Sequence, residues 1–243
     1  MSLFVIADLH LSTAAETDKS MEVFGRRWTQ YTERLEKNWR ALITDDDTVV
    51  IPGDISWATT PDEALSDFRF LGQLPGKKLL GKGNHDFWWS SVTKMHRFLA
   101  ENGISDMDFL HNNAHETDEY ILCGTRGWFV DPGATGAPAG SDAEKLVARE
   151  NIRLRISLDA GRQLQRISGK EILVFLHFPP VWYDFVCEPL LQTLGDYGIR
   201  RCYYGHIHGN YTVPPTLSYR NIDFCITSAD YLEFIPRLIR PSV

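Results

Sequence analysis

Short apolar runs alternate along the chain with longer stretches of helical periodicity. Six runs end in polar or glycine-containing residues: LFVIADLH (3–10), TVVIPGD (48–54), KKLLGKGNHD (77–86), EYILCGTRG (119–127), EILVFLHFPP (171–180) and RCYYGHIH (201–208). Most of them are continuously apolar, which is typical of strands that are covered on both faces. They predict six buried strands.

Helical periodicity fills the gaps between these runs, because apolar side chains recur there three or four residues apart and form one stripe. The segments with this pattern cover residues 28–42, 60–74, 92–99, 141–158 and 188–197. Two begin with a capping box, Thr60-Pro61-Asp62-Glu63 and Ser141-Asp142-Ala143-Glu144. The alternation predicts one layered α/β domain over residues 1–243, with functional residues on loops just beyond the strand ends.

The composition is that of an ordinary globular protein. The chain has 243 residues, of which 43% are hydrophobic and 23% charged, and its net charge is −7. That charge argues against a broad basic surface for polymeric nucleic acid and favours a small substrate, although two bound divalent cations would add four positive charges locally. The sequence leaves the oligomeric state open.

The sequence predicts a cytoplasmic protein. The first apolar run is short, lacks a preceding basic segment and contains Asp8, so it does not resemble a signal peptide. No apolar run approaches membrane-spanning length. The four cysteines stand singly, without a CxxC pair, and are expected to be reduced, buried thiols: Cys123, Cys187, Cys202 and Cys225.

Metal-ligand residue types follow nearly every predicted strand. They are Asp8, His10, Asp54, Asn84, His85, Asp86, His177, His206 and His208. In extended backbone, residues two apart face the same side, so Asp8 with His10, and His206 with His208, are expected to present two groups together. Glycines just before Asp54, Asn84 and His206 allow sharp turns out of the sheet.

The chemistry of this set points to catalysis by two metal ions. Imidazole nitrogens occur with carboxylate and amide oxygens, without thiolates, which suits Mn, Fe, Zn or Co. Asp54 has two carboxylate oxygens and could bridge two ions ~3.5–4 Å apart, a separation typical of two-metal hydrolases. Such a pair binds phosphoryl oxygens and lowers the pKa of a bound water.

The ordered series D-x-H, GD, GNHD, H and GHxH, over residues 8–208, resembles the calcineurin-like metallophosphoesterase superfamily. The resemblance implies that one divalent metal ion is held by Asp8, His10 and His208, that the other is held by Asn84, His177 and His206, and that Asp54 bridges them. It also implies a core of two packed mixed β-sheets flanked by helices, in four layers.

The same resemblance implies a mechanism for hydrolysing phosphomonoesters or phosphodiesters. A metal-bound hydroxide would attack phosphorus, while His85 binds the phosphate and helps to protonate the leaving group. Asp86 would orient His85. The rival interpretations are a non-catalytic metal-binding scaffold with the same fold and a nuclease that acts on short nucleic acid.

Differences from neighbouring branches narrow the resemblance. Protein Ser/Thr phosphatases carry GDxHG, GDxVDRG and GNHE, where this chain has ADLHLS, GDISWA and GNHD. Lipid A pathway hydrolases usually have GNRD, and the DNA repair nucleases are longer. A compact bacterial-type phosphodiesterase or phosphatase remains.

Several further residues have two possible roles. Trp88 and Trp128 could form an apolar wall against the substrate or could pack in the core. Arg126 could reach the phosphate or form a surface salt bridge. His96, His111 and His115 are expected to be structural, and Asp45–Asp47 to form a solvated turn. Residues 131–140, rich in Gly, Pro and Ala, are expected to form a surface loop, with a lid as one possibility.

Overall fold

Two β-sheets contain nearly all the strands of the computed structural model, which describes residues 1–13, 21–129 and 141–241. In the first sheet the order is β13 (Arg237–Ile239), β1 (Leu3–Val5), β2 (Thr48–Ile51), β3 (Lys77–Leu80) and β4 (Met107–Phe109). In the second it is β11 (Thr216–Tyr219), β12 (Ile222–Ile226), β10 (Arg201–Tyr204), β7 (Glu171–Leu176), β6 (Tyr120–Thr125) and β5 (Ala114–Glu116). A separate hairpin pairs β8 (Val181–Trp182) with β9 (Phe185–Val186).

The central strands of both sheets are parallel, and the antiparallel strands lie at the edges. In the first sheet β1, β2, β3 and β4 run parallel, and β13 pairs antiparallel with β1. In the second, β12, β10, β7 and β6 run parallel, with β11 and β5 antiparallel at the two edges. The carboxyl ends of the parallel strands in each sheet therefore meet at one edge.

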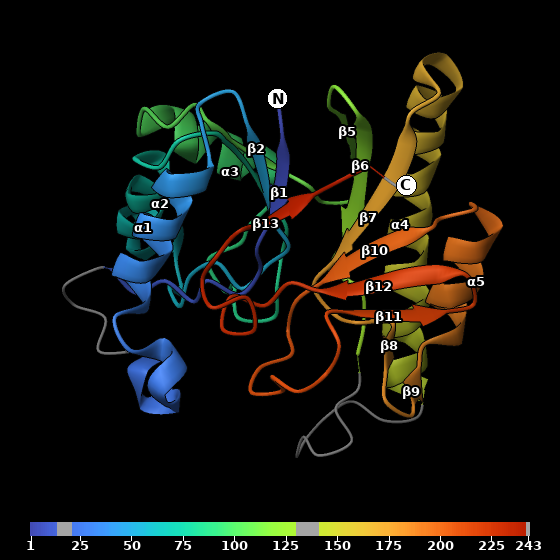
Figure 1. Cartoon of the computed structure of the whole chain (residues 1–243). Coiled ribbons are helices and arrows are strands. Elements are labelled where there is room, and N and C mark those ends of the chain that lie inside the picture. The colour runs from blue at the N-terminus through green and yellow to red at the C-terminus, as the bar shows by residue number, and fades with distance from the viewer. Residues whose placement is uncertain (14–20, 130–140, 242–243) are drawn as a thin grey trace.

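Helices cover the outer face of each sheet (Figure 1). The first sheet is covered by α1 (Tyr31–Leu42), α2 (Pro61–Gly72) and α3 (Val92–Glu101), and the second by α4 (Ser141–Ser168) and α5 (Glu188–Asp196). Two 3-10 turns, η1 (Met21–Phe24) and η2 (Arg26–Trp28), precede α1. The result is a layered arrangement of helices, sheet, sheet and helices, which confirms the expected fold class.

One hydrophobic core lies between each sheet and its helices, and a third lies between the two sheets. Val5 and Val50 of the first sheet meet Leu122 and Phe175 of the second in this cluster, all at most 2% exposed. The ring of Phe175 stacks on that of Tyr203 with 5.2 Å between centroids. Because the inner strands bury side chains on both faces, they have the continuous apolar sequences that predicted them.

The six expected strands and five expected helices are present, but their ends differ from the pattern. The strands end before the polar residues, for example at Val5 in β1 and Ile51 in β2. Trp28, assigned to the first helix, lies in η2, since Gln30 adopts a left-handed backbone (φ 49°) between the two. The short strands β4, β5, β11, β12 and β13 were not predicted.

Two capping boxes were predicted, and one can be inspected. Thr60 caps α2, and its hydroxyl oxygen accepts a hydrogen bond from the Glu63 amide at 3.3 Å. The Glu63 carboxylate accepts one from the Thr59 amide at 2.8 Å. The side chain of Ser141 and the expected loop at 131–140 lie outside what the structure describes.

The expected solvated turn at Asp45–Asp47 is wrong for Asp47. That side chain is 7% exposed, and its carboxylate accepts hydrogen bonds from the Ser2 amide at 2.6 Å and the Thr44 amide at 2.9 Å. Asp47 thereby ties the N-terminus to the start of β2. Asp45 and Asp46 are exposed, as expected.

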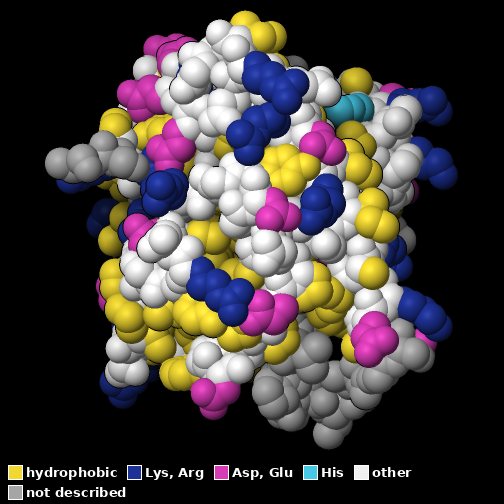
Figure 2. All heavy atoms as spheres, turned by 90° about the vertical axis from the view of Figure 1, so that its right-hand side faces the viewer, with side chains coloured by type: hydrophobic (Ala, Val, Ile, Leu, Met, Phe, Trp, Pro, Cys, Tyr) yellow, Lys and Arg dark blue, Asp and Glu magenta, His cyan; other side chains and the backbone are white. Residues whose placement is uncertain are grey.

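The surface and the cysteines agree with the sequence expectations where they can be compared. All four cysteines are free and buried. Within the described ranges, no helix is both long and apolar enough to cross a membrane. On the face that carries α4 and α5, basic and acidic side chains are interspersed, so no broad field of one sign covers this side (Figure 2).

Candidate metal centre

The residues expected to bind metal converge where the parallel strands of both sheets end. Asp8 and His10 follow β1, Asp54 follows β2, and Asn84 follows β3. The second sheet contributes residues after β7 and β10, namely His177, His206 and His208. Most are buried: Asp8, His10, Asp54 and His177 are at most 2% exposed. Segments far apart in sequence thus form one cluster of polar groups inside the protein.

The backbone at this cluster is strained. Asp8 (φ 59°), His10 (φ 45°), Asp54 (φ 52°) and His206 (φ 70°) all lie in the left-handed region, which non-glycine residues rarely occupy. The expectation that extended backbone presents Asp8 with His10 is therefore wrong, because the strand has already ended at Val5. Tight left-handed turns bring the two side chains together instead.

Two glycines let these turns approach one another. A Cβ atom on Gly205 would lie 2.6 Å from the Cβ of Ala7 and from Asp8 Oδ2, and one on Gly83 would collide with the Asp54 carboxylate. Any side chain at either position would therefore displace a carboxylate of the cluster.

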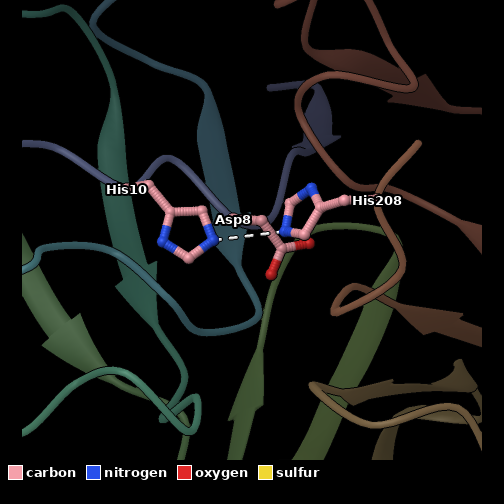
Figure 3. Close-up of side chains that lie close together, drawn as sticks. All are labelled: Asp8, His10 and His208. Atoms are coloured by element: carbon pink, nitrogen blue, oxygen red, sulfur yellow. Dashed lines mark hydrogen bonds between the residues drawn. The ribbon is translucent and has the colours of Figure 1, made fainter. Parts of the chain in front are cut away.

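One donor group consists of Asp8, His10 and His208, each of which offers a ligand atom within 4.8 Å of the others. The Nε2 atoms of His10 and His208 are 3.2 Å apart, and the Asp8 carboxylate lies beside both rings (Figure 3). Two ligands about 2.1 Å from one ion lie roughly 3 Å apart at a right angle, so this spacing suits a shared metal.

A second donor group surrounds His177. Its Nε2 lies 2.7 Å from Asn84 Oδ1 and 3.5 Å from Asp54 Oδ2. Asn84 Oδ1 also lies 3.1 Å from Nδ1 of His206. Asp8, Asp54 and His177 form the second set of Asp and His groups that could hold an ion.

The Asp54 carboxylate lies between the two donor groups. Its Oδ2 atom is 3.7 Å from Nε2 of His10 and 3.5 Å from Nε2 of His177. Its other oxygen accepts a hydrogen bond from the His85 amide at 2.8 Å, which fixes the orientation of the carboxylate.

Hydrogen bonds fix two of the imidazole rings. The Nδ1 of His177 lies 3.1 Å from the Pro52 carbonyl oxygen, which leaves Nε2 facing the cluster. The Nδ1 of His208 lies 2.8 Å from Asp230, whose carboxylate also accepts hydrogen bonds from the Gly209 amide and the Tyr211 hydroxyl.

Asp230 was missed in the sequence, although a signal existed. It follows the buried strand β12 in the segment IDFCITSAD, in the same position relative to a strand end as the other acidic residues. Like them it is fully buried, but it contacts a histidine of the cluster through Nδ1, the ring atom that faces away from His10.

The pKa values of five residues in the cluster are shifted, and burial is the largest cause for four of them. Burial raises the pKa of Asp8 to about 8, with a further contribution from the Asp54 carboxylate, and it raises that of Asp54 as well. Burial and the neighbouring histidines hold the pKa of His10 well below its usual range, and burial does the same for His177. Although burial opposes it, the hydrogen bond to Asp230 raises the pKa of His208 to about 9.

These residues fit a pair of divalent cations. Neutral imidazoles at His10 and His177 are the form that binds metal, and buried carboxylates lacking counter-charges are stabilised by cations. Asp8 Oδ1 is buried and accepts no hydrogen bond from the described residues, so it is available as a ligand atom.

A match to a protein-family model assigns the chain to a family. The model described as calcineurin-like phosphoesterase matches residues 1–210, most of the chain. The chain belongs to the calcineurin-like phosphoesterase family. Membership confirms the resemblance seen in the motifs, and it implies metal-dependent hydrolysis of phosphoesters in general.

Two solved structures are similar to this chain. The protein TT1561 of Thermus thermophilus is 11% identical with a TM-score of 0.54, over 94% of this chain and 89% of that one, and this likeness concerns the fold alone. The protein of unknown function AQ665 from Aquifex aeolicus is 15% identical with a TM-score of 0.46, over 98% of this chain and 95% of that one. A comparison with curated proteins finds no match.

The motif histidine His85 lies beside the metal cluster, half-buried against Trp57. Their ring centroids are 4.4 Å apart, and the centroid of His10 is 5.6 Å from that of His85. Trp57 also stacks on His10 at 4.9 Å. The sequence did not indicate that Trp57 contacts both His10 and His85.

The expectation that Asp86 orients the His85 ring is wrong, because the Asp86 carboxylate accepts hydrogen bonds from backbone amides instead. It accepts hydrogen bonds from the amides of Gly83 (2.7 Å), Ile55 (2.8 Å) and Asp54 (2.9 Å). Burial, with the Asp54 carboxylate, raises its pKa to about 7, although these amides lower it. Asp86 holds the turns of Asp54 and Asn84 together and acts on His85 only through the loop.

Of the three residues that could contact a substrate according to the sequence, one lies in the core and two are half-buried. Trp88 is 1% exposed and its indole donates to Asp86 at 3.0 Å, so it has no face for a substrate and packs in the core. Trp128 is half-buried. Arg126 forms no ion pair with the described residues, which contradicts the salt-bridge alternative, and its guanidinium lies 5.7 Å from the ring centres of Trp128 and Phe178.

The three remaining histidines lie outside the metal cluster. His96 and His115 both face Asp108 on the surface, at 2.7 Å and 3.8 Å. His111 is half-buried, its ring centroid 5.3 Å from that of Trp89, and burial lowers its pKa to about 4.

Proposed function

We propose that this protein hydrolyses phosphomonoesters or phosphodiesters with two divalent metal ions. Asp8, His10 and His208 would hold one ion, and Asn84, His177 and His206 the other. Asp54 would bridge the pair. The observation that carries the proposal is the position of Asp54 Oδ2, 3.7 Å from His10 and 3.5 Å from His177, between the two donor groups.

When bound, two such ions supply positive charge that binds phosphoryl oxygens and lowers the pKa of a water molecule. Mn, Fe, Zn and Co all suit nitrogen and oxygen donors of this kind. The contribution of the chain is to hold the donors in place, through strained turns at Asp8 and Asp54 and through the bonds that fix His177 and His208.

His85 would bind the scissile phosphate and protonate the leaving group. Its backbone is tied to the bridging carboxylate, since its amide donates to Asp54 Oδ1 at 2.8 Å. Its ring is half-buried between Trp57 at 4.4 Å and Phe87 at 6.2 Å. A ring held on two sides beside the metal cluster is placed to transfer a proton to a departing oxygen.

The test loads the purified chain with Mn and compares a chromogenic phosphodiester with the matching phosphomonoester. We expect turnover of at least one ester, loss of turnover with a strong chelator, and recovery when metal is restored. His85→Ala should lower kcat by about 10²–10⁴-fold while retaining bound metal, as removal of a general acid does.

Full turnover in the presence of chelator would contradict the proposal. Bound metal without turnover of any phosphate ester would instead favour the non-catalytic scaffold. A small phosphate ester as substrate is part of the proposal, and the same comparison sorts monoesters from diesters.

A further inference from the structure

A group of basic side chains lies beside the metal cluster. Lys82 stands in the loop just before Asn84, Arg126 follows β6, and Arg149 and Arg153 project from α4. We call these four residues the basic cluster. One buried carboxylate, Glu150, pairs with part of it: Arg153 Nη1 lies 2.6 Å and Arg149 Nε 3.8 Å from Glu150 Oε1.

The other two cations have no such partner. Neither Lys82 nor Arg126 forms a side-chain hydrogen bond or an ion pair with any described residue, although both are partly buried. Removing a cation from water without an anion costs free energy. Burial lowers the pKa of Lys82, and the charges of Arg126 and Arg153 lower it further, so these cations lie close enough to repel one another. Binding of an anion there would relieve that repulsion.

Buried polar atoms without partners occur at the same place. They are Arg126 Nε, Trp128 Nε1 and His111 Nδ1. The guanidinium of Arg126 lies 5.7 Å from the ring centre of Trp128, so two of the three atoms belong to neighbouring side chains. Arginine and indole N–H groups can only donate hydrogen bonds, so the group that completes them must be an acceptor.

This place adjoins the metal cluster without being part of it. The guanidinium of Arg126 also lies 5.7 Å from Phe178, whose ring packs on His177 at 4.9 Å and on His206 at 4.5 Å. Burial lowers the pKa of Arg126, Arg149 and Arg153 add to that effect, and Glu150 and Asp54 oppose it. Arg126 thus interacts with both the bridging carboxylate and the cations of α4.

We propose that Lys82, Arg126 and Arg153 form a subsite for a second anionic group, phosphate or carboxylate, on the ester that the metal centre hydrolyses. The substrate class is then a phosphoester with a further negative charge close to the scissile phosphate. Arg153, held by Glu150, would provide charge, and the planar fork of Arg126 would provide paired hydrogen bonds. This inference rests on the proposed function.

The test measures binding by calorimetry to the metal-loaded protein. The probes are ethyl-, propyl- and butylphosphonate and the corresponding ethane-, propane- and butane-bisphosphonates, which differ in the second anion and span several spacings. We expect at least one bisphosphonate to bind about tenfold or more tightly than its monophosphonate partner, as a paired charge contact provides.

Variants test which residues cause the preference for the bisphosphonate over the monophosphonate. Lys82→Gln and Arg126→Gln should each reduce it several-fold, and Arg126→Lys should retain part of it. Arg155→Gln is the matched control on α4, because Arg155 pairs with exposed Asp196 at 3.3 Å. Metal content is measured for every variant. If Arg126→Gln loses metal, Arg126→Lys takes its place, and if Lys82→Gln loses metal, Lys82→Met takes its place.

The proposal is overturned if no bisphosphonate is preferred, or if the preference survives in both glutamine variants. The ester assay separates the two proposals. A preference lost in the variants, with no turnover of any ester, would sustain the subsite and remove the proposed function. Turnover of an ester without any preference for a bisphosphonate would sustain the proposed function and remove the subsite.

Discussion

Buried polar groups differ in their hydrogen-bond partners between the carboxyl ends and the amino ends of the parallel strands. At the carboxyl ends, Asp8 Oδ1, His10 Nδ1 and Arg126 Nε are buried and form no hydrogen bond with the described residues. At the amino ends, Asp47 accepts bonds from Ser2 and Thr44, while buried Lys78 donates to the Leu74 carbonyl and to Asp106. The carboxylate of Asp47 and the ammonium of Lys78 are thus paired within the chain, whereas the atoms without partners at the carboxyl ends are suited to bind ligands.

The amino ends also show that the size of a hollow does not identify a functional site. A cavity of about 930 Å³ lies there, lined among others by Lys77, Asp106 and Leu122. Buried Lys78, which lines this cavity, is paired with Asp106, whereas the metal cluster contains the buried atoms Asp8 Oδ1 and His10 Nδ1 without a hydrogen-bond partner among the described residues. Unsatisfied buried polar atoms are rare in proteins, so they discriminate better than volume does.

The largest expected effect is that of Asp54→Asn, which tests whether the polar groups at the carboxyl ends serve function rather than stability. Loss of the bridging carboxylate should lower kcat/KM by about a thousandfold or more, since electrostatic stabilisation of the reacting group is lost. Metal analysis of the purified variant should give less bound metal than in the parent. Since burial raises the pKa of Asp54, the metal-free variant should unfold at no lower denaturant concentration than the parent.

A smaller effect is expected from Asp230→Asn. The ring of His208 would lose a charged partner at 2.8 Å, and loss of such a partner typically lowers metal affinity by about 10–100-fold. Competition with a chromogenic chelator measures that affinity. Asp223→Asn on the same segment is the control, because Asp223 is exposed and its carboxylate accepts a hydrogen bond from the Ser218 hydroxyl. Equal affinity in both variants would remove the role given to Asp230.

The smallest expected effect lies at the other end of the strands. Asp47→Asn should reduce the free energy of unfolding by about 1–3 kcal/mol at neutral pH, because the amides of Ser2 and Thr44 lose a charged acceptor. Turnover and metal content should be unchanged. Denaturant titration measures the first, and Asp46→Asn, an exposed neighbour, is the control.

The pH dependence of Asp47 has a definite sign. Burial alone would raise its pKa, but hydrogen bonds from Thr44 and Ser2 outweigh it and lower the pKa below the unfolded value of about 3.9. The stabilisation is therefore present above pH about 4 and is lost as pH falls through the folded pKa. The parent should lose more stability than Asp47→Asn on acidification; parallel curves would count against this.

Much of the site could be read from the sequence because its residues follow strands in a fixed order. The motifs name Asp8, Asp54 and His177 without any structure, and the continuous apolar runs place them at strand ends. The short edge strands were not foreseen, since three or four residues covered on one face give little periodicity. Trp88 and Trp128 look alike in sequence, yet one is core and the other half-buried.

The sequence by itself determined the alternation of strands and helices, the family, and which residue types lie at the strand ends. Only the tertiary structure decided how they meet. Left-handed turns at Asp8 and His206 stand where extended backbone was expected, the Asp86 carboxylate accepts hydrogen bonds from the backbone, and Asp230 lies against His208. The physical reason is that hydrogen bonding and burial at the site join segments almost two hundred residues apart, and no local pattern encodes those contacts.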